Sequence, residues 1–180
     1  MMDTVTVWIM TATTVAFVSA TGGQNARQDI KLSAQSFIEK AAEGQQVEIA
    51  LGQHAFERAG SEQVMQFGAQ MVKDHQKARQ GVEQLASREG VQLPTRLAGK
   101  HEHKKEPFSQ LAVKEFDQAY MTHMLRYHKK DIRKFEEGMH ALMNPQIQQW
   151  AEGTLPILKR HLQKAQQIAT SIGISQQTGH

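Results

Sequence analysis

The chain has 180 residues and a formal net charge of +3, a size that suits one domain with a sizeable hydrophobic core. Aromatic residues make up only 6% of it, which favours helices over a β-sheet protein, and basic and acidic residues alternate along the chain, which argues against nucleic-acid binding. Because the chain has no cysteine, disulfides, thiolate metal sites, a lipoprotein anchor and covalently attached haem are excluded, and we expect no haem.

The start of the chain has the pattern of an export signal. Residues 4–20 carry no charge, and the small residues of Val-Ser-Ala at 18–20 suit signal peptidase. The opening Met-Met-Asp lacks the usual basic residue, so an uncleaved anchor and a cytosolic tail stay open as alternatives. We expect residues 1–20 to be a signal peptide and residues 21–33 to be a flexible polar lead-in. The protein is then periplasmic or secreted.

A first helix is predicted over residues 34–59. Its apolar residues recur at helical spacing, and Glu48 falls on the same face as they do. Gly44 and Gly52 stand one turn to either side of Glu48. Glycine is unfavourable inside a helix, so we expect both to let a neighbouring helix approach closely.

A second helix is predicted over residues 62–89, after a C-terminal cap at Gly60 and an N-cap at Ser61. So short a link makes the two helices an antiparallel hairpin. His75 stands in the middle of the apolar stripe of this helix, and Asp74 precedes it.

The next segment, residues 90–106, does not keep a helical period. It can span roughly 55 Å if extended, more than the length of about 42 Å of the preceding helix. We therefore predict a long crossover between the second and third helices, as in ferritin-like bundles. His101 and His103 within it are interpreted as part of a solvated basic loop.

A third helix is predicted over residues 107–142. His128 lies on its apolar face, and Asp131, one turn further on, is expected to accept a hydrogen bond from the second ring nitrogen of His128. We expect the next helix to restart at once, after Asn144 as N-cap.

The fourth helix is predicted over residues 145–172, with Pro145 in its first position and His161 on its apolar stripe. Residues 174–180 are expected to be frayed. The fold class is therefore all-α, a ferritin-like four-helix bundle over residues 34–173.

Each predicted helix places one ionisable residue on its apolar face, and the four are Glu48, His75, His128 and His161. Within each hairpin the two residues stand at nearly the same distance from the turn, to within roughly 3 Å, so each pair should face across the core. A carboxylate and three imidazoles can bind zinc, copper or iron, with Asp74 and Asp131 as outer hydrogen-bond partners. A closed network of buried hydrogen bonds without metal stays equally open.

A dinuclear iron oxidase is not favoured. Such a site uses Glu on two helices and Glu-x-x-His on the other two, whereas Val72, Leu125 and Leu158 stand three residues before the histidines. No nucleophile elbow, phosphate-binding loop or hydrolase triad is present. We predict no catalytic residue and regard a non-enzymatic role as the better interpretation.

Four segments together resemble one family of bacterial exported proteins. They read FIEKAAEGQQVEIALG at 37–52, FGAQMVKDH at 67–75, FDQAYM at 116–121 and TLPILKRHL at 154–162. The chain is similar in these segments to the domain of unknown function 4142 family, whose members are often labelled predicted outer-membrane proteins. The resemblance covers about residues 34–170.

This resemblance implies a ferritin-like bundle, an envelope or secreted location and no established activity. The recurring polar positions of the family correspond to Glu48, Asp74, His75, His128 and His161. The chain departs from the family where Tyr127 precedes His128, since an Asp-His pair is frequent there.

The sequence does not identify a partner. Peripheral contact with the cell envelope, outer-membrane association and a homodimer all stay open. The first hypothesis is a metal-binding envelope protein. The alternative is a non-enzymatic envelope stress or interaction protein with a metal-free polar core, which we expect to expose an apolar patch larger than a few hundred Å².

Overall fold

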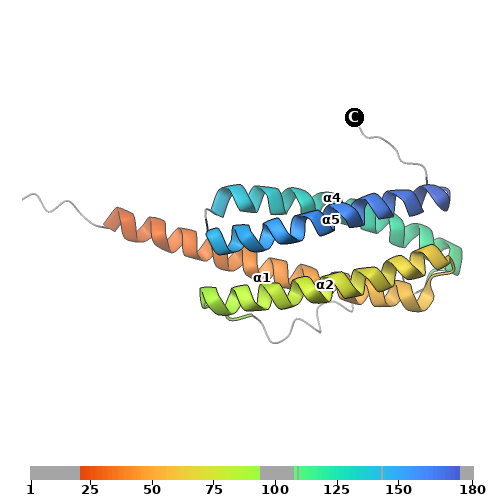
Figure 1. Cartoon of the computed structure of the whole chain (residues 1–180), viewed down its shortest axis with the longest axis horizontal. Helices are drawn as coiled ribbons and strands as arrows, with labels where there is room; N and C mark the ends of the chain where they lie inside the picture. The colour runs from red at the N-terminus through yellow and green to blue at the C-terminus, as the bar shows by residue number, and fades with distance from the viewer. Residues whose placement is uncertain (1–20, 94–107, 109, 143, 175–180) are drawn as a thin grey trace, which may run out of the picture.

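The computed structural model describes residues 21–93, 108, 110–142 and 144–174. Over these residues the chain forms long α-helices and no strand (Figure 1), so the predicted all-α four-helix bundle is confirmed. The helices are α1 (Thr21–Arg58), α2 (Glu62–Glu89), α4 (Val113–Leu142) and α5 (Pro145–Ser171). The expected signal peptide, the loop histidines and most of the expected frayed tail lie outside the described residues. None of the described helices is long and apolar enough to cross a membrane.

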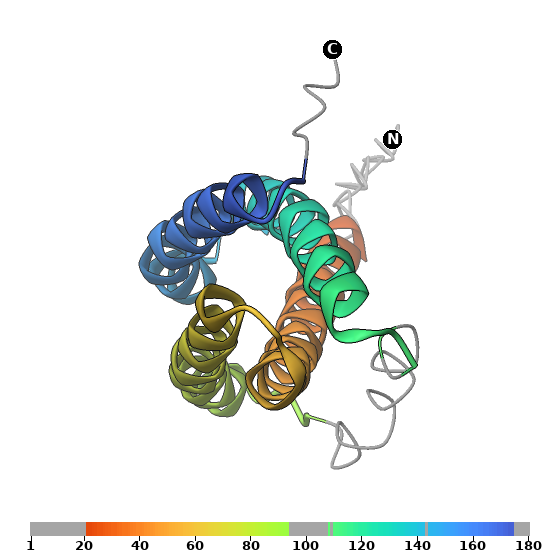
Figure 2. The same cartoon turned by 90° about the vertical axis from the view of Figure 1, so that its right-hand side faces the viewer.

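The helices surround one core in the order α1, α2, α5, α4 (Figure 2). The hairpin of α1 and α2 packs against the hairpin of α4 and α5, through α2 against α5 and α1 against α4. The two helices of each hairpin are antiparallel, as predicted (Figure 1). Each helix therefore has two neighbours and one diagonal partner.

Hydrogen bonds at the two ends of the bundle show where α2 ends and where α4 starts. At one end the Asp117 carboxylate of α4 accepts from the backbone N–H groups of Gly60 and Ser61, at 3.1 and 2.7 Å. At the other end the Asn144 amide donates to the Glu89 carboxylate at 2.9 Å. The end of α2 and the start of α4 thus lie at opposite ends of the bundle. Most of the predicted crossover, residues 94–107, lies outside the described residues.

Some of the helix caps expected from the sequence are formed and one is not. Asn144 accepts from the backbone N–H groups of the first turn of α5, and Gly90 adopts a left-handed conformation with φ of 66° after α2, both as expected for such residues. Ser61 is the N-cap residue of α2, but its side chain forms no capping hydrogen bond. The carboxylate of Asp117, from another helix, instead accepts from the backbone N–H of Ser61 itself.

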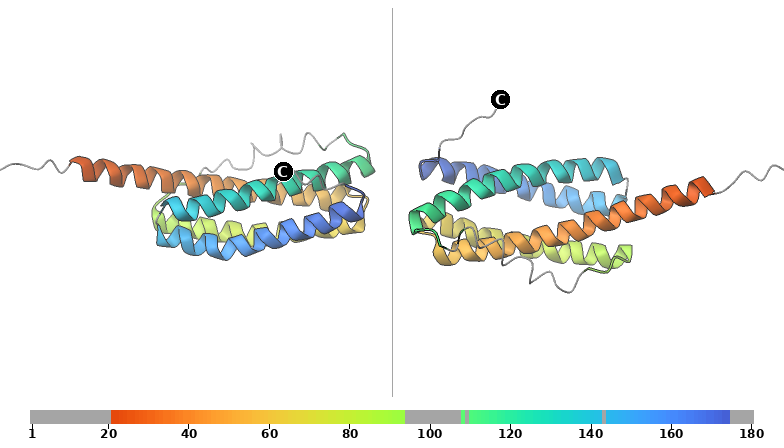
Figure 3. Two further views of the ribbon diagram at one scale, coloured as in Figure 1. Left: turned by 90° about the horizontal axis from the view of Figure 1, so that it is seen from above. Right: turned by 180° about the vertical axis from the view of Figure 1, so that it is seen from behind.

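Two helix starts differ from expectation. Helix α1 begins at Thr21, so residues 21–33 are helical rather than a lead-in, and the start of α1 extends beyond the other helices (Figure 3). This segment has no proline to stop the helix. Helix α4 begins at Val113 rather than near 107, because the Glu115 carboxylate accepts from the Ala112 N–H and so caps the helix there.

One of the two expected glycine contacts is present. A Cβ on Gly52 would lie 2.8 Å from the carbonyl oxygen of Gly68, and a Cβ on Gly68 would lie 2.7 Å from the carbonyl oxygen of Gly52. This glycine pair lets α1 and α2 approach closely. The expectation for Gly44 was wrong, because a Cβ there would meet nothing within 4 Å.

Candidate metal centre

Three histidines from three helices meet in the middle of the bundle. They are His75 of α2, His128 of α4 and His161 of α5, with exposed fractions of 3%, 1% and 4%. One ligand nitrogen from each lies within 4.8 Å of those of the other two. The ring centroid of His161 is 5.2 Å from that of His75 and 5.4 Å from that of His128. The cluster therefore brings together residues from both hairpins.

Apolar side chains enclose the cluster. Phe67 stacks edge-on against the His161 ring with a centroid distance of 6.3 Å. The largest apolar cluster among the described residues has one buried member a helical turn away from each histidine. These members are Met71, Met124 and Ala165. Leu158 and Phe135 belong to a separate apolar cluster. This environment weakens solvation and strengthens every electrostatic interaction inside it.

One nitrogen of each histidine ring is held by a hydrogen-bond acceptor. Nδ1 of His75 lies 2.7 Å from Oε1 of Gln45, and Nδ1 of His128 lies 3.0 Å from the backbone oxygen of Met124. Nε2 of His161 lies 2.8 Å from Oδ2 of Asp74. A carbonyl or carboxylate oxygen only accepts, so these three nitrogens carry the protons. Outer partners of this kind fix the tautomer and orientation of metal-binding histidines.

The other nitrogen of each ring has no hydrogen-bond partner among the described residues. These buried atoms are Nε2 of His75, Nε2 of His128 and Nδ1 of His161. Because the first nitrogens carry the protons, each of these three presents a lone pair to the interior. A buried polar atom without a partner costs about 1–3 kcal/mol, so three together need an explanation.

The pKa values of the histidines favour the neutral, metal-binding form. Burial lowers the pKa of His75 well below its usual value, and the charges of His161 and His128 lower it further. Burial and the neighbouring His161 lower the pKa of His128 to about 4. Burial also lowers the pKa of His161, although Asp74 acts in the opposite direction. Burial thus favours the neutral form of all three rings.

Glu48 is buried on α1 with an exposed fraction of 2%, and neither of its carboxylate oxygens has a hydrogen-bond partner among the described residues. Burial, followed by the charge of Asp131, raises the pKa of Glu48 to about 8. Glu48 does not belong to the set of ligand atoms within 4.8 Å of one another. The structure thus brings three of the four predicted site residues into one cluster and leaves the fourth buried outside it.

Of the two aspartates expected to hold the histidines, Asp74 does so and Asp131 does not. Asp74 accepts from His161, so it holds a histidine of another helix rather than its neighbour His75. Burial acts to raise the pKa of Asp74, but hydrogen bonds from Gln70 and His161 outweigh it and lower that pKa. The expected bond from His128 to Asp131 is not formed, because Nδ1 of His128 reaches the carbonyl of its own helix four residues earlier. Asp131 instead lies 3.9 Å from Nζ of Lys134.

Gln45 is 4% exposed and holds His75, a role that was not predicted from the sequence. Its signal was present in the sequence: it stands one helical turn before Glu48, so it shares the apolar face of α1. The Met124 carbonyl has no sequence signal, since every residue has a backbone oxygen.

The donor set fits a transition-metal ion. Imidazole nitrogens bind zinc, copper and iron, and metal–nitrogen distances of about 2.0–2.1 Å place tetrahedral ligands about 3.4 Å apart. One ring nitrogen of each histidine lies within 4.8 Å of those of the other two, so the rings have to move inward to reach this spacing. Three protein ligands leave one coordination position open, the arrangement typical of reactive rather than purely structural sites.

Comparisons with known proteins give one match. The family model described as "Domain of unknown function (DUF4142)" matches residues 19–168, which confirms the resemblance seen in the sequence. No curated protein and no solved structure matches the chain.

Proposed function

The chain belongs to the DUF4142 family, and we propose that it binds one transition-metal ion through His75, His128 and His161. The family description assigns no activity, so the proposal depends on the site alone. Zinc, copper and iron are the candidate metals, because imidazole suits all three.

The observation that carries this proposal is the three buried ring nitrogens without a hydrogen-bond partner among the described residues. A metal-free polar core, the alternative function, predicts that such nitrogens bond to one another or to Glu48. Instead each ring directs its proton to an outer acceptor and keeps its lone pair for the interior. A metal ion is the partner that three converging lone pairs suit best.

Glu48 supplies the negative charge that the three neutral imidazoles lack. Its carboxylate oxygens are buried and unpartnered among the described residues, which suits a buried counter-charge to the ion. A cation in the cluster would favour the ionised form of Glu48 and lower its pKa from about 8. Metal binding is then coupled to the release of a proton.

The site is proposed to work in the cell envelope. Support comes from the uncharged residues 4–20 and the small residues before position 21, which suit export and cleavage. A bound ion of this kind supplies Lewis acidity or, for copper and iron, electron transfer. The chain's own residues hold the ion, orient the rings through Asp74 and Gln45, and surround them with apolar side chains.

Metal titration of the protein without a histidine tag tests the proposal. Cobalt(II) in place of zinc gives visible absorption bands, and elemental analysis counts the ions. We expect about one ion per chain in the wild type and none above background in a double variant with His75→Ala and His161→Ala. His54→Gln is the control, because His54 lies outside the cluster. Equal metal content in the wild type and the double variant would end the proposal.

A further inference from the structure

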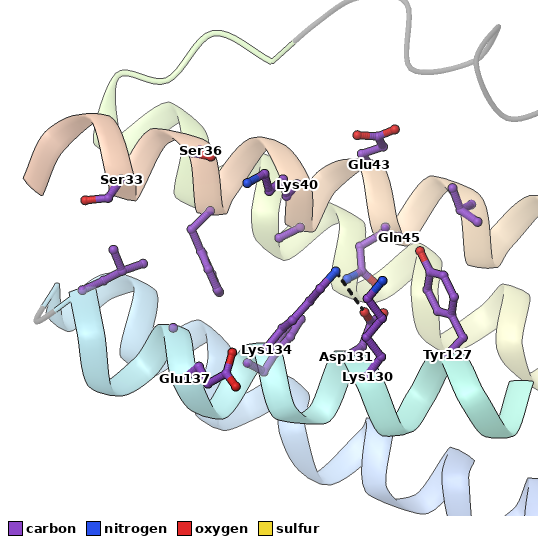
Figure 4. Close-up of a pocket in the computed structure, with 17 residues that line it drawn as sticks. Ser33, Ser36, Lys40, Glu43, Gln45, Tyr127, Lys130, Asp131, Lys134 and Glu137 are labelled. Atoms are coloured by element: carbon purple, nitrogen blue, oxygen red, sulfur yellow. Dashed lines mark ion pairs between the residues drawn. The ribbon is translucent and has the colours of Figure 1, made fainter. Parts of the chain in front are cut away.

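A groove of about 710 Å³ lies between α1 and α4 (Figure 4). On the α1 side it is lined by Lys40, Glu43 and Gln45, and on the α4 side by Tyr127 and Asp131, among others. The two helices belong to different hairpins and pack against each other. A groove of this volume is larger than one ion needs.

The inner wall of the groove touches the histidine cluster. Gln45 lines the groove and, through Oε1, accepts the hydrogen bond from Nδ1 of His75 at 2.7 Å. The side chain is 4% exposed, so it reaches from the groove into the core. One side chain therefore separates the groove from the ring of His75.

A partly buried carboxylate lines the groove. Asp131 has a side chain that is 18% exposed, and Figure 4 shows it between Tyr127 and Lys134 on α4. The other charged residues that line the groove are exposed, and they are Lys40, Glu43, Lys130, Lys134 and Glu137. A cation that moves from the groove towards the core therefore meets the carboxylate of Asp131.

The groove is kept open on α1 by the absence of a side chain at Gly44. A Cβ built on Gly44 would meet nothing within 4 Å, although the glycine lines the groove. Glycine weakens a helix by about 1 kcal/mol relative to alanine, and no close helix approach accounts for it here. The effect of glycine at position 44 is to leave free space in the groove.

We propose that the groove between α1 and α4 is the route by which a metal ion reaches the three histidines, with the carboxylate of Asp131 and then the amide of Gln45 on the way. This inference rests on the proposed metal site. A divalent cation that leaves water needs negative groups along its path, and a carboxylate at the groove raises its local concentration. Gln45, between the groove and His75, moves aside as the ion passes.

The test is the rate of cobalt(II) binding to the full chain, followed by stopped-flow absorption. Gly44→Phe fills the groove, and we expect it to slow binding by about tenfold or more without changing the number of ions bound at equilibrium. Gly153→Phe is the matched control: Gly153 is also a helical glycine with nothing within 4 Å of an added Cβ, but it lies on α5 and does not line the groove.

A second variant tests the charge without added bulk. Asp131→Asn is expected to slow binding by about threefold to tenfold, an effect that high salt reduces, while Glu152→Gln on the exposed face of α5 leaves the rate unchanged. Binding at the wild-type rate in either Gly44→Phe or Asp131→Asn overturns the proposed route. A wild type that binds no cobalt at all overturns the metal site itself, so the two failures are distinguishable.

Discussion

His161 on α5 donates a hydrogen bond from Nε2 to Oδ2 of Asp74 on α2, over a distance of 2.8 Å. The bond joins the two hairpins at the level of the histidine cluster. It also fixes which nitrogen of His161 carries the proton, and so leaves Nδ1 for a ligand. Asp74 precedes His75 in the chain, so two adjacent residues of α2 serve the site in different ways.

Asp74→Ala is expected to weaken metal binding by about 10–100-fold without abolishing it, because the ring of His161 loses the acceptor that orients it. The measurement is a competition titration against a chelator of known affinity. Glu83→Ala is the matched control, since Glu83 also lies on α2 and its partner Arg79 is outside the cluster. An affinity that stays at the wild-type value would show that Asp74 does not position His161.

Glu48→Gln is expected to make the metal-free protein more stable than the wild type at pH 8 and above. Burial raises the pKa of Glu48 from 4.5 to about 8, so the folded chain keeps a proton that the unfolded chain releases above pH 4.5. The contribution of Glu48 to stability is complete below pH 4.5 and is lost as the pH rises towards 8, by at most about 1.4 kcal/mol per pH unit.

Urea unfolding with a chelator present, at pH 5, 6.5 and 8, measures this difference. The variant should lack the loss of stability that the wild type shows as the pH rises. Glu43→Gln, an exposed carboxylate on the same helix, should keep it. Parallel pH profiles for the wild type and Glu48→Gln would contradict the burial of an ionisable Glu48.

The sequence predicted the four helices because their signals are local. Ser61 before Glu62 and Gly90 after Glu89 gave the limits of α2, and Asn144 before Pro145 marked the start of α5. The start of α1 was missed, since a polar stretch without periodicity does not reveal that a helix continues through it.

The site was predictable at the level of its ring positions but not of its hydrogen bonds. Counting residues from the turns placed Glu48 level with His75 and His128 level with His161, and the structure brings the three histidines together but leaves Glu48 outside their cluster. The partner of His128 depends on a side-chain rotamer that spacing does not specify, so the expected Asp131 was replaced by the Met124 carbonyl.

Gly52→Ala and Gly44→Ala should have opposite effects on stability. An added Cβ at Gly52 would lie 2.8 Å from the backbone oxygen of Gly68, so α1 and α2 have to separate, at a cost of about 1–3 kcal/mol. At Gly44 the space is open, and alanine should stabilise the helix by up to about 1 kcal/mol. Urea unfolding of the two variants compares them, and equal effects would contradict the close contact of α1 with α2.

The most direct test of the metal site is a crystal of the protein grown with zinc, with diffraction data collected on both sides of the zinc absorption edge. The account predicts one anomalous peak in the core, about 2.0–2.1 Å from a ring nitrogen of each of His75, His128 and His161. Anomalous peaks only at surface residues, with the core empty, would contradict it.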